Sequence, residues 1–147
     1  MEICTIGTAK RSAESLFGAL IEADVELLAD TRLRATSQLA GFTQARDLAY
    51  FVPRLTRAAY RVAPDLAPTK TMLDDYKRGV IDWAAYEHAY LALLEERDAA
   101  SSVSWLRELP SSRVALLCSE QTAEHCHRWL AADYLAAAWG GVSVRHL

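Results

Sequence analysis

Short apolar segments alternate along this chain with longer segments whose apolar residues recur at helical spacing, and this alternation limits the fold more than any other feature. The clearest apolar segment is Val114-Ala115-Leu116-Leu117-Cys118, which is typical of a buried strand. Strands that alternate with helices favour a mostly parallel sheet with helices on both faces. We therefore predict one three-layer α/β domain over residues 1–147, with about five strands.

The spacing of apolar residues and of turn-forming residues places the elements along the chain. It predicts strands at residues 3–8, 25–29, 60–62, 113–118 and 142–147. It predicts helices at residues 12–21, 43–52, 69–79, 82–99 and 122–139. Residues 69–109 are then a helical insertion before the fourth strand. We expect Thr43 to cap the second helix, Pro53 to end or bend it, and residues 33–42 and 110–112 to form a loop and a turn.

Composition excludes several classes of protein. A net charge of −3 with 52% hydrophobic residues excludes global disorder, and three cysteines are too few for a disulfide scaffold. No apolar run approaches the ~18 residues of a spanning helix, and residues 1–9 carry no signal-peptide pattern. We therefore expect a cytoplasmic protein with reduced thiols and no membrane partner.

Arginine is concentrated in residues 31–61, which hold six arginines against the single acidic residue Asp47. The pattern fits a solvated surface, and it also fits a local face that binds anions. The small net charge argues against a general duplex-binding protein, whose affinity comes from many phosphate contacts. Nucleic acid is therefore a partner that the sequence allows but does not favour.

Ionisable side chains gather where the predicted parallel strands end, and this is the edge at which open α/β sheets bind ligands. Cations and helix N-termini at one edge favour a small anionic ligand. The candidates for catalysis are Asp30, Cys118, Glu120 and His127, and the candidates for ligand binding are Thr8, Arg11, Arg32, His125 and Arg128.

Most of these candidates also have a purely structural interpretation. Cys118 is either a nucleophile activated by the following helix or a core residue that closes a strand. Asp30 and Arg32 share one sheet face, so a structural ion pair competes with a catalytic pair. His127 is either a semi-buried structural histidine or a proton carrier. Arg128 is expected to point away from the apolar stripe of its helix, and from the first turns of that helix it could still reach the strand ends.

A metal site and a phosphate loop find little support. On a helix, the consecutive residues His125, Cys126 and His127 would point about 100° apart and could not share one ion, and Cys126 would lie on the apolar face. Gly7 alone does not make a glycine-rich phosphate loop. Trp83, Tyr86 and Tyr90 share a stripe that is typical of packing rather than base stacking. We assign no metal ligand, and the sequence does not indicate which cofactor, if any, the protein uses.

The most specific motif of the chain is Leu-Cys-x-Glu followed by Cys-His-Arg, at residues 117–120 and 126–128. Together with several shorter segments it resembles the DUF488 family, a domain of unknown function, over essentially the whole chain. The family's usual Pro-x-Ser-Arg stretch is replaced here by Ala35-Thr36-Ser37-Gln38. The other segments are Thr5-Ile6-Gly7, Asp30-Thr31-Arg32, Gly41-Phe42, Leu66-Ala67-Pro68-Thr69 and Val144-Arg145-His146-Leu147. The resemblance implies a compact α/β fold and a shared site at Asp30, Arg32, Cys118, Glu120, Cys126, His127 and Arg128, without naming a reaction.

Two functional hypotheses follow. The first is an enzyme acting on a small anionic substrate, such as a nucleotide or a phosphorylated metabolite, with Arg32 and Arg128 holding the anion. In it Asp30 or Glu120 is the acid or base and His127 a second proton carrier. The alternative is a non-catalytic module that binds nucleic acid or protein through residues 31–61 or 69–109. An apolar face on residues 80–95 also allows a homodimer.

Overall fold

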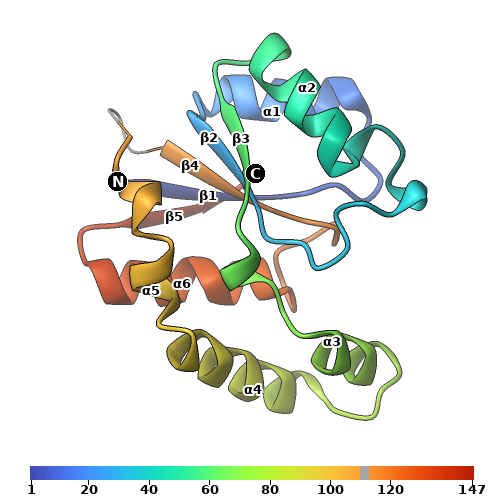
Figure 1. Cartoon of the computed structure of the whole chain (residues 1–147), viewed down its shortest axis with the longest axis vertical. Coiled ribbons are helices and arrows are strands. Elements are labelled where there is room, and N and C mark those ends of the chain that lie inside the picture. Colours follow the sequence, from blue (N-terminus) through green and yellow to red (C-terminus); the bar gives the residue numbers. More distant parts are fainter. Residues whose placement is uncertain (110–112) are drawn as a thin grey trace.

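The structure is a computed structural model that describes residues 1–109 and 113–147, and Figure 1 shows its architecture. All five strands are parallel and form one sheet in the order β3-β2-β4-β1-β5. This confirms the predicted α/β class, while the turn predicted at residues 110–112 lies outside the described residues. The strands are β1 (Glu2–Gly7), β2 (Leu27–Asp30), β3 (Ala59–Val62), β4 (Arg113–Cys118) and β5 (Ser143–His146).

Helices cover both faces of the sheet, as predicted (Figure 1). One face carries α1 (Ala13–Glu22) and α2 (Ala45–Leu55). The other carries α4 (Trp83–Glu96), α5 (Ala99–Ser102) and α6 (His127–Trp139), with α3 (Lys70–Lys77) packed on α4. Short 3₁₀ turns are η1 (Gln38–Thr43), η2 (Pro64–Leu66) and η3 (Ser104–Arg107). Among the described helices, none combines the length and the apolarity needed to span a membrane.

The central strand β4 divides the core into two layers. Val114 and Leu116 pack with α4, α5 and α6, whereas Ala115 and Leu117 pack with α1 and α2. Successive side chains of a strand point to opposite faces, so this one apolar segment contributes to both layers. Each fully buried Leu or Val contributes roughly 1.5–3 kcal/mol, which makes β4 the anchor of the sheet. Its last residue, Cys118, is thereby held at a fixed place on the carboxyl edge.

The last helix begins later than predicted. The prediction started it at Thr122, but α6 begins at His127. His125 has a left-handed φ of 54°, and Cys126 has an extended backbone with φ −128° and ψ 139°. Residues 119–126 are therefore a loop, here called the β4–α6 loop. The loop is held open by tertiary hydrogen bonds to Arg128, which a local helix signal does not contain.

Other differences are smaller. Thr43 does not cap α2, because its hydroxyl donates to the Ala40 carbonyl and the N-cap is Gln44. Pro53 lies inside α2 without ending it, and the helix continues to Leu55. The loop predicted at residues 33–42 contains part of η1, and α4 ends at Glu96 instead of continuing to residue 99.

The end of β1 is packed too closely for any side chain. A Cβ added to Gly7 would lie 1.8 Å from the carbonyl oxygen of Glu120 and 3.0 Å from Arg128 Nη1. Glycine is therefore required here because the β4–α6 loop crosses directly over the end of β1. The close approach fixes the height of that loop above the sheet.

We expect Gly7→Ala to lower the free energy of unfolding by at least about 2 kcal/mol, because the clash is with backbone that cannot move aside. The matched control is Gly18→Ala in α1, where an added Cβ meets nothing within 4 Å. That control should raise stability by about 0.5–1 kcal/mol through helix propensity. Urea unfolding of both variants measures the difference, and equal midpoints would contradict the close approach.

Candidate functional site

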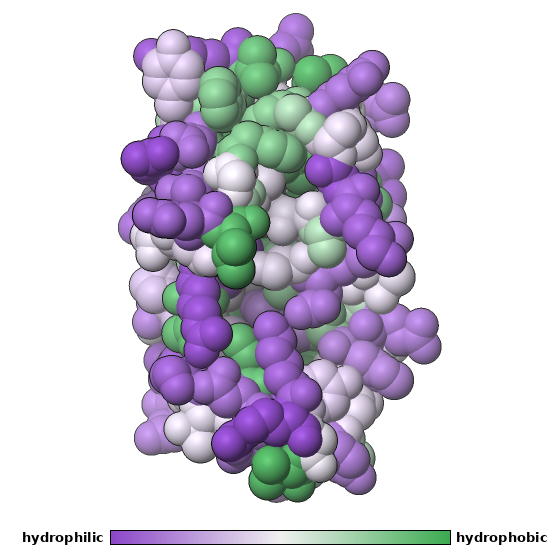
Figure 2. All heavy atoms as spheres, turned by 90° about the vertical axis from the view of Figure 1, so that its right-hand side faces the viewer, coloured by the Kyte–Doolittle hydropathy of each residue, from purple (hydrophilic) through white to green (hydrophobic). Residues whose placement is uncertain are grey.

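A pocket of about 440 Å³ opens at the carboxyl edge of β2 and β4. Figure 2 looks at the side of the molecule on which the strands end and shows a hollow across its middle, rimmed mainly by hydrophilic residues. Cys118, Cys126, His127 and most of the β4–α6 loop line the pocket from the sheet side. Tyr76, Lys77 and Tyr86 line it from α3 and α4. The helical insertion therefore forms one wall of the site.

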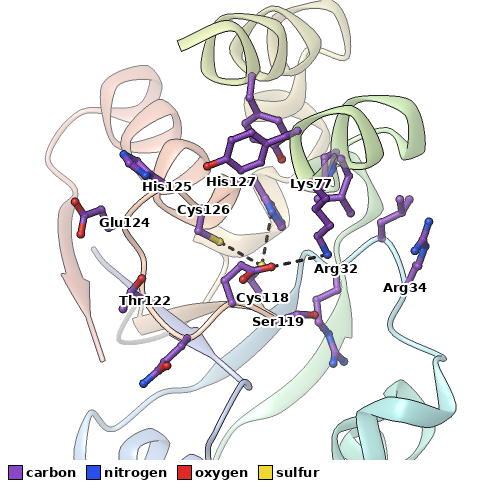
Figure 3. A pocket seen from close by; sticks show the side chains of 17 residues that line it. Arg32, Arg34, Lys77, Cys118, Ser119, Thr122, Glu124, His125, Cys126 and His127 are labelled. Atoms are coloured by element: carbon purple, nitrogen blue, oxygen red, sulfur yellow. Dashed lines mark hydrogen bonds and ion pairs between the residues drawn. The ribbon is translucent and has the colours of Figure 1, made fainter. Parts of the chain in front are cut away.

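Two side chains converge on the sulfur of Cys118. The Cys126 thiol donates to it over 3.3 Å, and Nδ1 of His127 lies 3.6 Å away. The backbone of Glu120 makes a smaller contribution that also lowers the pKa of Cys118. Figure 3 shows Cys126 and His127 pointing toward Cys118 at the pocket. An acceptor of several hydrogen bonds is stabilised in its charged form, so this geometry favours a thiolate.

The protonation of His127 is set by Thr31. The Thr31 hydroxyl donates to the Leu117 carbonyl over 2.8 Å, so toward the imidazole it can only accept. His127 Nε2 lies 3.1 Å from that hydroxyl and 3.1 Å from the Thr31 carbonyl oxygen. Both neighbours of Nε2 are acceptors, which places a proton on Nε2. Nδ1 is then the nitrogen that exchanges a proton with Cys118.

The two thiols differ in acidity because one donates to the other. The hydrogen bond from Cys126, aided by the charge of His127, holds the pKa of Cys118 well below its usual value. The same bond, together with burial, raises the pKa of Cys126. Burial lowers the pKa of His127, but the charge and hydrogen bond of Cys118 outweigh it and the net pKa is raised. These shifts place the negative charge on Cys118 and leave Cys126 as the neutral thiol.

Arg128 lies inside the protein, which corrects the expectation that it points away from the apolar stripe. It is only 1% exposed. Its Nη1 donates to the Glu120 carbonyl over 2.8 Å and lies 3.6 Å from Cys126 Sγ. Within residues 1–109 and 113–147, no carboxylate lies at ion-pair distance from it. A buried guanidinium without a carboxylate favours a negative charge nearby, and the sulfur that Arg128 contacts is that of Cys126.

Asp30 and Arg32 form a buried ion pair beside this cluster. Arg32 Nη2 lies 2.6 Å from Asp30 Oδ2 and also donates to the Thr43 carbonyl over 2.8 Å. The Tyr60 hydroxyl donates to Asp30 Oδ2 over 2.6 Å. Both carboxylate oxygens thus have donors, since Arg32 Nε donates to Oδ1. The contacts favour the structural interpretation of this pair.

The pocket brings together part of the predicted site. Arg32, Cys118, Glu120, His125 and His127 line it. Thr8 and Arg11 do not line it, because the Thr8 amide bonds the Cys118 carbonyl and the Arg11 guanidinium donates to the Leu147 carbonyl.

Lys77 and Tyr86 line the pocket but were not predicted. Tyr86 belongs to the aromatic stripe that was correctly interpreted as packing, and its ring stacks on those of Trp83 and Tyr90. Lys77 carried no sequence signal, because only the docking of α3 brings it over β4.

The same cluster could hold a soft metal ion, although no metal was predicted, and the premise that residues 125–126 are helical was wrong. Cys118 Sγ, Cys126 Sγ and a ring nitrogen of His127 lie within 4.8 Å of one another. Cys126 precedes α6 in an extended conformation, so it and His127 do not diverge as helical neighbours would. Two sulfurs and one imidazole suit Zn²⁺ with an open fourth position. His125 is not in this group; its ring lies 5.0 Å from that of Trp83.

The arginine-rich stretch is largely engaged within the protein. Arg34 pairs with Asp74 at 3.1 Å and Arg46 with Asp47 at 3.2 Å. The guanidinium of Arg61 lies 3.8 Å from the ring centre of Trp105, and that of Arg54 lies 3.8 Å from that of Tyr50. These contacts are typical of a structured surface.

Comparison with known families agrees with the motifs in the chain. The family model of DUF488, described as a domain of unknown function, matches residues 12–135, which include the cysteine, histidine and arginine cluster. The chain belongs to the DUF488 family. No curated protein and no solved structure matches it significantly. Membership in DUF488 confirms the resemblance seen in the sequence but assigns no reaction.

We expect Asp30→Ala to lower the free energy of unfolding by about 3–5 kcal/mol, because it leaves the Arg32 charge buried without its partner. Arg46→Ala is the control, since its pair with Asp47 is exposed and its loss should cost at most about 1 kcal/mol. Chemical denaturation of both variants measures these costs. A small effect of Asp30→Ala would show that the pair does not stabilise the fold.

Proposed function

We propose that this protein is an enzyme in which the Cys118 thiolate attacks an electrophilic centre of a small anionic compound bound in the pocket. One observation carries the proposal: the Cys126 thiol and Nδ1 of His127 converge on Cys118 Sγ where it meets the pocket. A thiolate is the reactive form of cysteine, and its stabilisation at neutral pH is what a nucleophile requires. A structural core cysteine gains nothing from such an arrangement.

His127 fits the role of proton donor in this chemistry. Its Nε2 is fixed by Thr31, while Nδ1 faces Cys118 at 3.6 Å. An imidazolium in this position stabilises the thiolate before attack and can protonate a leaving group afterwards. Glu120 lines the pocket with its side chain about half exposed, so it is the carboxylate best placed for acid–base work. Both carboxylate oxygens of Asp30 already accept hydrogen bonds from Arg32 or Tyr60, so Asp30 supports the site structurally.

An anionic group on the substrate has suitable partners at the pocket. Lys77 Nζ lies 4.0 Å from Glu120 Oε1 and is otherwise exposed, so it is free to bind a ligand. The N-terminus of α6 points its amides toward the same loop. Among the described residues, the amides of Gln121, Thr122 and Ala123 have no protein acceptor. These groups support a phosphate-bearing or nucleotide-like ligand, whereas Arg32 and Arg128 already bind protein acceptors.

The alternative, a module that binds nucleic acid, has less structural support than the thiol site. The guanidinium groups of residues 31–61 that it would use are largely paired or stacked within the chain. The apolar residues of 80–95 that would form a homodimer are in part used internally, since Tyr86, Tyr90 and Leu94 belong to the core. Partner binding and a homodimer remain predictions, and the thiol site is the stronger proposal.

We expect iodoacetamide to alkylate Cys118 at pH 6, where an ordinary thiol is only about 0.3% ionised. The rate should be nearly constant from pH 6 to pH 8, because the pKa of Cys118 is lowered well below that of a free thiol. His127→Gln removes the imidazolium and should restore a rate that rises with pH. Mass spectrometry after proteolysis identifies the modified cysteine.

The internal control is Cys4, a buried thiol in β1 whose pKa is raised by burial. Cys4 should stay unmodified over the same pH range while the protein is folded. If Cys118 reacts only above pH 8, or reacts no faster than Cys4, the nucleophile is wrongly assigned.

We expect inorganic phosphate to protect Cys118 from alkylation, because it would occupy the anion position beside Lys77. Lys77→Ala should weaken this protection about fivefold, which corresponds to the loss of about 1 kcal/mol of charge attraction. Lys70→Ala is the matched control, because Lys70 pairs with Asp74 and does not line the pocket. Equal protection in the two variants would show that Lys77 does not bind the anion.

A further inference from the structure

The cluster contains a second thiol that a single nucleophile does not need. Cys126 Sγ lies 3.3 Å from Cys118 Sγ, and both thiols are free and buried. A disulfide needs about 2.05 Å between its sulfurs, so a modest rotation of the side chains would close the gap. Cys126 also precedes α6 in a loop, so moving its sulfur does not require a helix to unwind.

We propose that Cys126 is a resolving thiol and that Cys118 and Cys126 together reduce a small disulfide that enters the pocket. This inference rests on the proposed function of Cys118 as nucleophile and names the substrate class of that site. The pocket of about 440 Å³ is roomy for an organic disulfide, with an aromatic wall of Tyr76 and Tyr86 and a cation at Lys77. A resolving role for Cys126 explains why a second thiol lies beside the nucleophile.

In the first step the Cys118 thiolate attacks one sulfur of the substrate disulfide. The substrate S–S bond breaks, and its electron pair leaves with the first thiolate fragment. The His127 imidazolium, whose Nδ1 faces Cys118, protonates that fragment to a thiol. Cys118 is left in a mixed disulfide with the second fragment, and His127 is left neutral.

In the second step neutral His127 accepts the proton of Cys126. The resulting Cys126 thiolate attacks Cys118 Sγ, which forms the intramolecular disulfide and expels the second fragment, and His127 protonates that fragment. Arg128 Nη1, 3.6 Å from Cys126 Sγ, stabilises the transient Cys126 thiolate. The substrate gains two electrons from the cysteine pair and two protons, one from the His127 imidazolium and one from the Cys126 thiol, and leaves as two thiols. An external dithiol reductant returns the pair to its starting form.

The test is intact-mass analysis of the reduced full-length chain after incubation with glutathione disulfide in the presence of EDTA. The wild-type chain should lose two hydrogens without carrying glutathione and should release two glutathione molecules for each chain. Cys126→Ser should instead accumulate one glutathione on Cys118 and release a single molecule. Cys126→Ala should behave in the same way, which guards against an effect peculiar to serine.

The controls separate this inference from the proposed function. Cys4→Ser should behave as the wild type, and Cys118→Ser should form neither the adduct nor the disulfide. If the wild type keeps a stable glutathione adduct while iodoacetamide still alkylates Cys118, the resolving role of Cys126 is refuted and the nucleophile stands. If Cys118 is inert to both reagents, both proposals fail. Oxidation of the pair by a hydroperoxide but not by glutathione disulfide overturns the proposed substrate class.

Discussion

The geometry of the site depends on the hydrogen bond that the buried guanidinium of Arg128 donates to the Glu120 carbonyl. The donor is Nη1, and that carbonyl lies where any side chain at Gly7 would be. The end of β1, the β4–α6 loop and the first turn of α6 are thereby joined at one point. This junction keeps residues 119–126 out of helical conformation and lets Cys126 turn back toward Cys118. A substitution at Gly7, Glu120 or Arg128 would therefore shift the β4–α6 loop and, with it, the position of Cys126 relative to Cys118.

The electrostatics of the cluster follow from the same burial. Placing a charged guanidinium and an imidazole away from water costs free energy unless opposite charge lies close by. Among the described residues no carboxylate fills this role for Arg128, whose Nη1 contacts Cys126 Sγ, whereas Cys118 accepts from Cys126 and lies beside His127. The Cys118 thiolate and the His127 imidazolium therefore stabilise one another. Asp30 and Arg32 form a separate pair that supports the carboxyl end of β2.

Local patterns succeeded where a local cause decides the structure and failed where a distant contact does. The strand at residues 113–118 and the helices capped by Ser12, Thr69 and Asp82 were predicted because apolar spacing and capping side chains are contained in the segment itself. The helix predicted from Thr122 was wrong, because the bonds that hold that segment open come from Arg128. The expected outward direction of Arg128 failed for the same reason.

The α/β class, the sheet, the helical insertion and the family could all be predicted from the sequence, because alternation of apolar segments and the Cys-His-Arg block are properties of the chain read in order. The sequence also placed Cys118 and His127 at one edge, since parallel strands end together. Three features depend instead on how the elements pack: which sulfur is charged, the contact of Cys126 with Cys118, and the opposite wall formed by Lys77 and Tyr86. Those features depend on distances between segments, and such distances arise only when the layers pack.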